Sequence, residues 1–167
     1  AFVKGSCRDE REAYNGPANT DIWLYDSQNN SYSQLTTDTH NDIYPKWGND
    51  QTLFFQSARS GKYNVHQLTL DTNGAISGDV QAVTSFADMG ISSFSVGNNG
   101  QTILLDKGDQ LLSVNVSSKQ TTPINLAIGS DYRFDPIERK TYRNDVDQII
   151  PSPNGDYSAL VIRGEIF

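Results

Sequence analysis

The chain has 167 residues, with 13 basic and 20 acidic side chains, a formal charge of −7 and one cysteine. An acidic protein repels the phosphates of nucleic acids and of anionic membranes, so we expect neither nucleic-acid binding nor adhesion to an anionic membrane, and no membrane insertion is expected either. The single cysteine excludes an internal disulfide. No stretch approaches the roughly 20 apolar residues of a membrane-spanning helix.

The composition is typical of short strands joined by polar turns. Apolar residues make up 36% of the chain, and Asn, Gln, Ser, Thr, Asp and Gly dominate the remainder. Eight Tyr, seven Phe and two Trp are too many aromatic residues for a disordered chain. Helical stretches rich in Ala, Leu and Glu are almost absent. These features predict an all-β fold.

The predicted strands repeat along the chain. Turns followed by apolar strands occur at Trp47–Phe55, Val96–Leu105 and Ser152–Val161. Asn99-Gly100 and Asn154-Gly155 are the strongest signals for tight hairpin turns. A second strand pattern recurs at Asp21–Trp23, Asn64–His66, Gln110–Leu112 and Glu165–Phe167, and short outer segments follow it at Ser33–Thr36, Gln81–Thr84 and Thr122–Leu126.

This repeat has four strands in roughly 40–50 residues, which is the pattern of a β-propeller blade. A parallel α/β fold is disfavoured because it needs helical patterns of roughly 10–15 residues between strands. An immunoglobulin-like sandwich is the alternative, but it does not explain why the same four elements recur in order. We therefore predict blades of four antiparallel strands, about three blades plus the start of another.

We predict that residues 1–128 form the C-terminal blades of one propeller and that residues 146–167 form the first strands of a following propeller. The charged stretch 129–145 breaks the repeat, and we interpret it as a crossover or as an exposed loop between blades. A closed propeller needs at least four blades. We therefore expect the chain to be a piece of a larger polypeptide, or its open sheet edges to self-associate.

Several residues are predicted to act as structural blade signatures. The Ser-x-Arg pairs Ser6–Arg8 and Ser57–Arg59 match in the repeat, and we interpret them as hydrogen-bonding residues that join blades, with recognition at a propeller face as the alternative. The full set is Ser6, Arg8, Asp21, Trp23, Trp47, Ser57, Arg59, Asn64, Gly100 and Gly155. Aromatic side chains are expected to fill the interfaces between blades, with a peptide-binding groove as the alternative; they are Trp23, Tyr25, Tyr44, Trp47, Phe54, Phe55 and Phe94.

The residues predict no catalytic, cofactor or metal site. The two histidines are interpreted as a packed strand residue, His66, and a solvated turn residue, His40. Asp38 and Asp42 flank His40, but a zinc site generally needs three or four converging ligands. Cys7 is expected to be a small buried residue in a strand over Phe2–Cys7.

Longer motifs resemble the tricorn protease and its bacterial relatives. These are Asn15–Asp26, His40–Trp47, Phe54–Asn64, Ser152–Gly155 and Arg163–Phe167. The individual blade motifs are also similar to those of TolB-like propellers. The order of Gly-Pro-Ala-Asn-Thr-Asp-Ile-Trp, the charged stretch and Arg-Gly-Glu-Ile-Phe is the more selective feature.

The resemblance implies a six-bladed propeller ending near Ile128 and a seven-bladed one beginning near Val146. In that family the propellers precede a PDZ-like module and a serine-peptidase core, and they channel peptides to and from it. The resemblance thus implies a non-catalytic segment of a tricorn-like serine peptidase. Its partners would be peptides or unfolded polypeptides and the remaining propeller and peptidase domains, and no family catalytic residue matches a position of this chain. The alternative is a TolB-like protein-binding module without a peptidase domain. A periplasmic location is expected from the Asn-, Ser- and Thr-rich surface, with the cytoplasm as the alternative.

Overall fold

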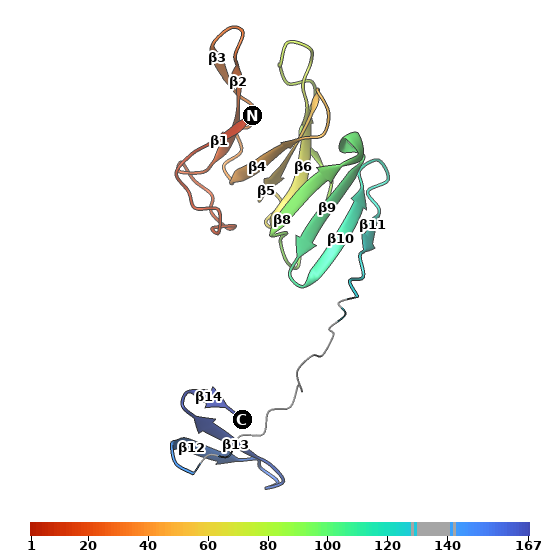
Figure 1. Cartoon of the computed structure of the whole chain (residues 1–167). Helices are drawn as coiled ribbons and strands as arrows, with labels where there is room; N and C mark the ends of the chain where they lie inside the picture. Colours follow the sequence, from red (N-terminus) through yellow and green to blue (C-terminus); the bar gives the residue numbers. More distant parts are fainter. Residues whose placement is uncertain (128, 130–140, 142) are drawn as a thin grey trace. The chain divides into compact units, whose positions relative to one another are not determined.

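The computed structural model describes residues 1–127, 129, 141 and 143–167, and the chain divides into the units Ala1–Leu126 and Ala127–Phe167 (Figure 1). Each unit is described by itself. Most of the predicted crossover, residues 129–145, lies outside the described residues, so that interpretation stays a prediction.

The first unit contains three antiparallel sheets that follow one another in chain order (Figure 1). The first sheet is formed by β1 (Phe2–Lys4), β2 (Asp21–Asp26) and β3 (Ser31–Gln34). The second sheet is formed by β4 (Asp42–Trp47), β5 (Thr52–Ser57), β6 (Asn64–Thr69) and β7 (Gln81–Ala82). The third sheet is formed by β8 (Ser93–Gly97), β9 (Thr102–Lys107), β10 (Gln110–Asn115) and β11 (Thr121–Pro123), with a 3-10 turn over Asn98–Gly100.

The second unit contains a fourth sheet of β12 (Val146–Pro151), β13 (Ser158–Ile162) and β14 (Glu165–Ile166). Within each sheet, strands adjacent in sequence pair with each other as antiparallel neighbours. The part of the chain that the structure describes has no α-helix, so no helix there could span a membrane. The predicted all-β class is confirmed.

The strand repeat predicted from the sequence appears in the strand boundaries. The four strands β2, β6, β10 and β14 begin at Asp21, Asn64, Gln110 and Glu165. In the same way β5 begins at Thr52 and β9 begins at Thr102. The sheets are therefore built on one pattern, and residues can be compared between them by register.

The core consists of two apolar clusters on the two faces of the second sheet. Because successive side chains of a strand point to opposite faces, Phe55 and Leu68 pack toward the first sheet while Phe54 and Val65 pack toward the third. Both faces of β5 are thus covered, and every residue from Leu53 to Ser57 is buried. The third sheet contributes Phe94, Ile103, Leu105, Leu112 and Val114 to its cluster.

The expectation for the aromatic residues is confirmed only in part. Phe54, Phe55 and Phe94 are buried in the two clusters. The expectation is wrong for Tyr25, Tyr44 and Trp47, which are exposed and lie outside the two clusters. Trp23 is half-buried, and the ammonium of Lys4 lies 4.3 Å from its ring centroid.

The two signature glycines lie in turns with left-handed backbone. Gly100 has φ 82°, and a Cβ there would lie 3.2 Å from the Cα of Gly48. Gly155 has φ 77° in the turn between β12 and β13. Glycine adopts this region without the steric penalty of other residues.

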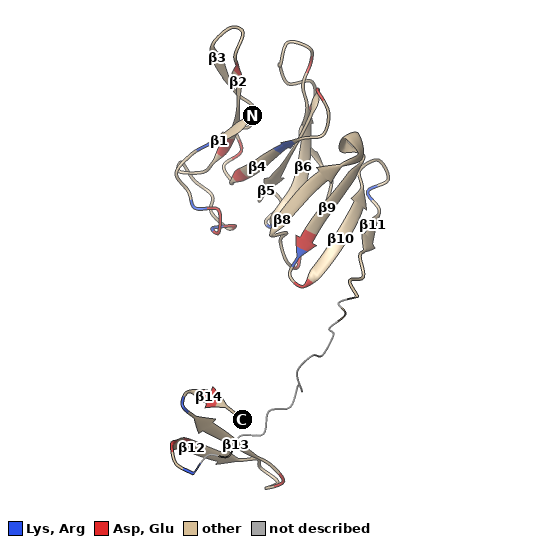
Figure 2. Ribbon diagram, viewed as in Figure 1, with Lys and Arg blue, Asp and Glu red and all other residues tan. Residues whose placement is uncertain are grey.

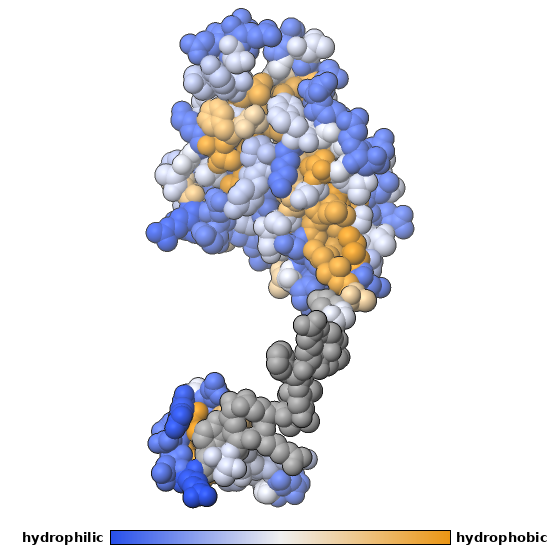
Figure 3. All heavy atoms as spheres, viewed as in Figure 1, coloured by the Kyte–Doolittle hydropathy of each residue, from blue (hydrophilic) through white to orange (hydrophobic). Residues whose placement is uncertain are grey.

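The third sheet leaves an apolar face open. By register, its Leu104 and Leu111 correspond to Phe54 and Val65, which the second sheet buries against the third. Leu104 is nevertheless 48% exposed and Leu111 is 39% exposed. Figure 3 shows apolar surface gathered along this sheet, whereas Figure 2 shows that charged residues are concentrated in loops and at strand ends. This face has the chemistry of the two buried interfaces but no covering layer among the described residues of its unit.

Candidate functional site

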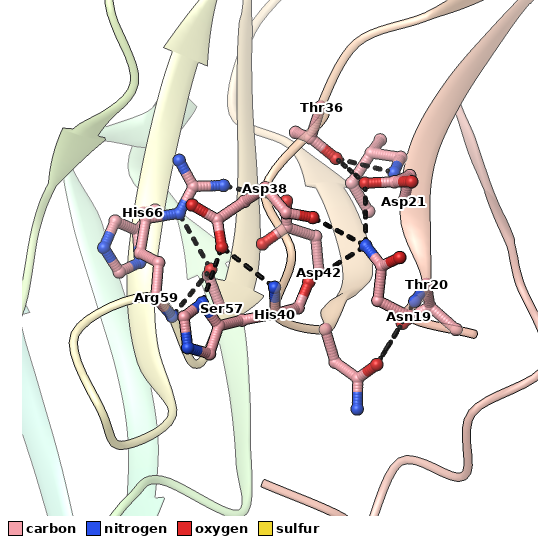
Figure 4. A network of polar contacts seen from close by, with 12 residues as sticks. Asn19, Thr20, Asp21, Thr36, Asp38, His40, Asp42, Ser57, Arg59 and His66 are labelled. Atoms are coloured by element: carbon pink, nitrogen blue, oxygen red, sulfur yellow. Dashed lines mark hydrogen bonds and ion pairs between the residues drawn. The ribbon is translucent and has the colours of Figure 1, made fainter. Parts of the chain in front are cut away.

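A polar network connects the first and second sheets (Figure 4). The amide of Asn19, which precedes β2, donates to the carbonyl oxygens of Asp38 at 2.6 Å and His40 at 3.3 Å in the connection to β4. Thr20 donates through its backbone N–H and its hydroxyl to Oδ1 of Asn41. The network thus fixes the chain where it passes from one sheet to the next.

An ion pair lies at the centre of the network. Nη2 of Arg59 lies 2.8 Å from Oδ2 of Asp42, and Nε of Arg59 donates to Oγ of Ser57 at 2.9 Å. The Asp42 side chain is fully buried, and this burial raises the pKa of its carboxyl above the usual value, while the Arg59 guanidinium opposes the rise. Charged Asp42 therefore depends on Arg59 for compensation.

His40 is held in place on both sides. Its Nδ1 lies 2.7 Å from Oδ1 of Asp38, and its Nε2 lies 3.3 Å from Nδ2 of Asn15. The prediction of a solvated turn residue holds in part: 25% of the His40 side chain is exposed, but an isolated bridge between Asn15 and His40 brings the β1–β2 loop against this turn. Within the described ranges, no group of three His, Cys, Asp or Glu residues is placed to hold a metal ion.

His66 is a packed strand residue, as predicted. It is 3% exposed, its ring stacks on Phe55 with centroids 6.0 Å apart, and its Nδ1 lies 3.2 Å from the carbonyl oxygen of Asn64. Burial lowers the pKa of His66 to about 4. The ring is therefore neutral at physiological pH.

A threonine motif at the outer edge of the sheets was not predicted. Thr84 accepts a hydrogen bond from the backbone N–H of Val65 at 2.9 Å and donates to Oδ1 of Asn64 at 2.8 Å. In the first sheet, Thr36 accepts from the N–H of Ile22 at 2.9 Å and lies 3.4 Å from Oδ1 of Asp21. The recurrence of Leu-Thr and Val-Thr in the outer segments was the sequence signal for this motif.

Asp21 and Asn64, two of the blade-signature residues, therefore bind the threonine of the neighbouring outer segment. Burial is the main cause that raises the pKa of Asp21, and the Asp42 charge adds to it. The hydrogen bonds from Thr36 and Gln34 oppose this rise.

The strand register separates the two Ser-x-Arg pairs. Asn64 lies opposite Ser57 in the second sheet, and the equivalent Asp21 lies opposite Lys4 in the first. Ser6 and Arg8 follow the end of β1, so they do not stand at the positions of Ser57 and Arg59. The expected strand over Phe2–Cys7 is also too long.

Cys7 lies in the loop after β1 and is half-buried. Its sulfur accepts a hydrogen bond from Nδ2 of Asn41 at 3.4 Å. The expectation of a fully buried strand residue is therefore wrong, because the backbone N–H groups of Ser6 and Cys7 already turn toward the carbonyl of Ala18.

Comparison with known proteins identifies the fold. No protein-family model matches the sequence, and no curated protein matches it either. The structure is similar to the tricorn protease, with a TM-score of 0.56 and 19% identity over 92% of this chain and 14% of that chain. It is also similar to TolB from Acinetobacter baumannii, with a TM-score of 0.53 and 12% identity over 93% of this chain and 38% of that chain. The chain is a partial β-propeller.

The predicted resemblance to tricorn-like and TolB-like propellers is thus confirmed for the fold, and each sheet is a complete or partial blade. The chain spans well under two thirds of the length of either structure. Within this fold, the polar network is the join between the first two blades.

Proposed function

We propose that this chain is a non-catalytic propeller segment of a tricorn-like serine peptidase and forms part of a channel through which peptides reach or leave the peptidase core. The fold likeness to the tricorn protease over 92% of the chain carries the proposal. The motif order noted in the sequence supports it.

The chemistry of the polar network supports a structural role for this segment. A serine nucleophile needs a histidine that accepts its proton. His40 is bound to Asp38 and Asn15, and His66 is buried within the second blade. Among the described residues, neither imidazole hydrogen-bonds a serine hydroxyl, and we therefore assign the peptidase chemistry to other domains of the full protein.

The open apolar face of the third blade supports the proposed partners. On this face, Leu104 and Leu111 stand at the positions of Phe54 and Val65, which the second blade buries against its neighbour. An exposed apolar face of this kind is typical of an interface with a further blade. We expect the remaining blades of the propeller to cover it in the full protein, and copies of this chain to cover it in the isolated segment.

A TolB-like protein-binding module without a peptidase domain is the second candidate. The TM-score of 0.53 with TolB, over 93% of the chain, favours it. The reading frame after Phe167 separates the two functions. A PDZ-like segment followed by a serine-peptidase domain, and hydrolysis of unstructured peptides by the full protein, supports the first function. A frame that ends after the propeller refutes it and supports the second.

A further inference from the structure

A pocket of about 380 Å³ in the first unit is lined by residues from all three of its blades. The loop between β1 and β2 supplies Asp9, Glu10 and Glu12 to its wall, and Figure 2 shows the charged residues gathered in this loop. The opposite wall is formed by residues around β4–β6 and by the segment before β8. Loops far apart in the sequence therefore meet at this pocket.

Within the ranges that the structure describes, two of the three carboxylates have no basic partner. Both carboxylate oxygens of Glu12 already have partners within the protein. Its Oε2 lies 3.1 Å from Nζ of Lys62, and its Oε1 accepts a hydrogen bond from the N–H of Tyr63 at 2.6 Å. Asp9 accepts a hydrogen bond from the hydroxyl of Tyr44 at 2.7 Å but, like Glu10, it contacts no Lys or Arg in the described part of the chain. Among the described residues, the pocket thus presents two carboxylates that form no ion pair.

A buried amide oxygen in the pocket wall also lacks a partner. Gln56 lines the pocket, is 2% exposed, and donates through Nε2 to the carbonyl oxygen of Ile91 at 3.0 Å. Its Oε1 is buried and accepts no hydrogen bond from any residue that the structure describes. Buried acceptors are nearly always satisfied in folded proteins. Because Gln56 lines the pocket, a ligand bound there can supply the missing donor.

The surroundings of the two tyrosines in the pocket wall raise the pKa of both phenols. The hydrogen bond to Asp9, burial, and the charges of Asp9 and Glu10 raise the pKa of Tyr44 to about 12. Burial raises the pKa of Tyr63, and the charges of Asp9 and Glu12 add to the rise. Both phenols therefore stay neutral and add no negative charge to the pocket.

The backbone of Tyr44 adopts a strained conformation. Its φ of 54° lies in the left-handed region, at the bulge where the pairing of β4 with β5 shifts between Ile43 and Lys46. A bulky residue rarely adopts this region, and such strain clusters at binding sites. Ile43, Met89 and Ile91 line the pocket with apolar side chains, which suits an alkyl stem.

We infer that this pocket binds a cationic group on an apolar stem, the side chain of a lysine or arginine in an extended peptide. Asp9 and Glu10 neutralise the charge, Oε1 of Gln56 accepts one N–H, and the apolar wall contacts the methylene groups. The peptide nature of the ligand rests on the proposed function. The cationic group rests on the pocket alone.

The test measures the binding of short fluorescent Gly/Ser-rich peptides to the full chain by fluorescence anisotropy. One peptide carries a central lysine, one an arginine and one an acetyl-lysine, which keeps the stem and removes the charge. We expect the lysine or the arginine peptide to bind more tightly than the acetylated peptide. We also expect Glu10→Gln to weaken that binding about fivefold, as for an exposed ion pair. The matched control Glu165→Gln removes the same charge from β14 in the second unit and should leave the affinity unchanged.

A site-specific readout completes the test, because exposed charges also attract cations at a distance. The side-chain amide signals of Gln56 in a ¹⁵N-labelled chain should shift when the cationic peptide binds. Charge-dependent binding that ignores Glu10→Gln and leaves these signals unmoved overturns the inference. Equal affinity for the charged and the acetylated peptides overturns it too, while the proposed peptide-channel function stands. If no peptide binds, the inference is wrong, while the proposed function is still decided by the reading frame and by hydrolysis in the full protein.

Discussion

The ion pair between Arg59 and Asp42 within the second blade gives the sharpest prediction for the polar network. Replacing Arg59 by methionine leaves the fully buried carboxylate of Asp42 without its cation. Removing one partner of a buried pair typically destabilises a protein by about 3–5 kcal/mol. Because 21% of the Arg59 side chain is exposed, we expect a loss near the lower end, about 3 kcal/mol at pH 7.

The pH dependence of this loss identifies its cause. Without the guanidinium, the pKa of Asp42 rises further above the ordinary 3.8 of the unfolded chain. The folded variant then holds a proton that the unfolded chain releases, so its deficit in unfolding free energy shrinks as the pH falls toward 3.8. Urea denaturation followed by circular dichroism at pH 7 and at lower pH measures this change.

A matched control and a second variant test whether the buried charge of Asp42 causes the loss of stability. Asp88→Asn breaks the pair with Lys107, where the Asp88 side chain is 73% exposed, and should barely change the denaturation midpoint. Combining Arg59→Met with Asp42→Asn should recover part of the lost stability. A deficit for Arg59→Met no larger than that of the control, or one that does not depend on pH, would refute the account.

Three further predictions follow from the blades. Thr84→Val leaves the N–H of Val65 without its acceptor and should cost about 1–3 kcal/mol in the free energy of unfolding, measured by urea denaturation. The pKa of His66 is about 4 in the folded chain, against 6.5 for an unperturbed histidine. As the pH falls from 6.5 to 4, the unfolded chain therefore binds a proton that the folded chain does not, and the free energy of unfolding drops by about 3 kcal/mol. Thermal melts across this range should show a smaller acid loss for His66→Leu. Leu104→Glu should reduce self-association through the open blade face in sedimentation without unfolding the chain, whereas Leu105→Glu, at 2% exposure, should unfold it.

The strand repeat was predictable because each blade follows the same local rules. The starts of β2, β6, β10 and β14 coincide with the recurring short strand pattern. Turn glycines such as Gly100 were also predictable from the sequence, since Asn-Gly pairs favour turns with left-handed backbone. Alternation of side chains then placed Phe54 and Phe55 in the core.

Features that depend on contacts between distant segments were not predictable. The Ser-x-Arg pairs look alike in sequence, but pairing between strands sets their register and separates Ser6 from Ser57. The fixed position of His40 comes from Asn15, which lies 25 residues earlier. The pocket forms because blade packing brings Asp9 and Glu10 near Gln56, and a short charged loop gives no sign of that neighbour.

One measurement tests the central claim, that this chain contacts polypeptide without cleaving it. The purified chain and the full protein are incubated with the same unstructured lysine-containing peptide, labelled so that binding and hydrolysis are both recorded. The account predicts that the full protein hydrolyses the peptide, while the chain of 167 residues binds it and leaves it intact. Hydrolysis by the purified chain itself would contradict the account.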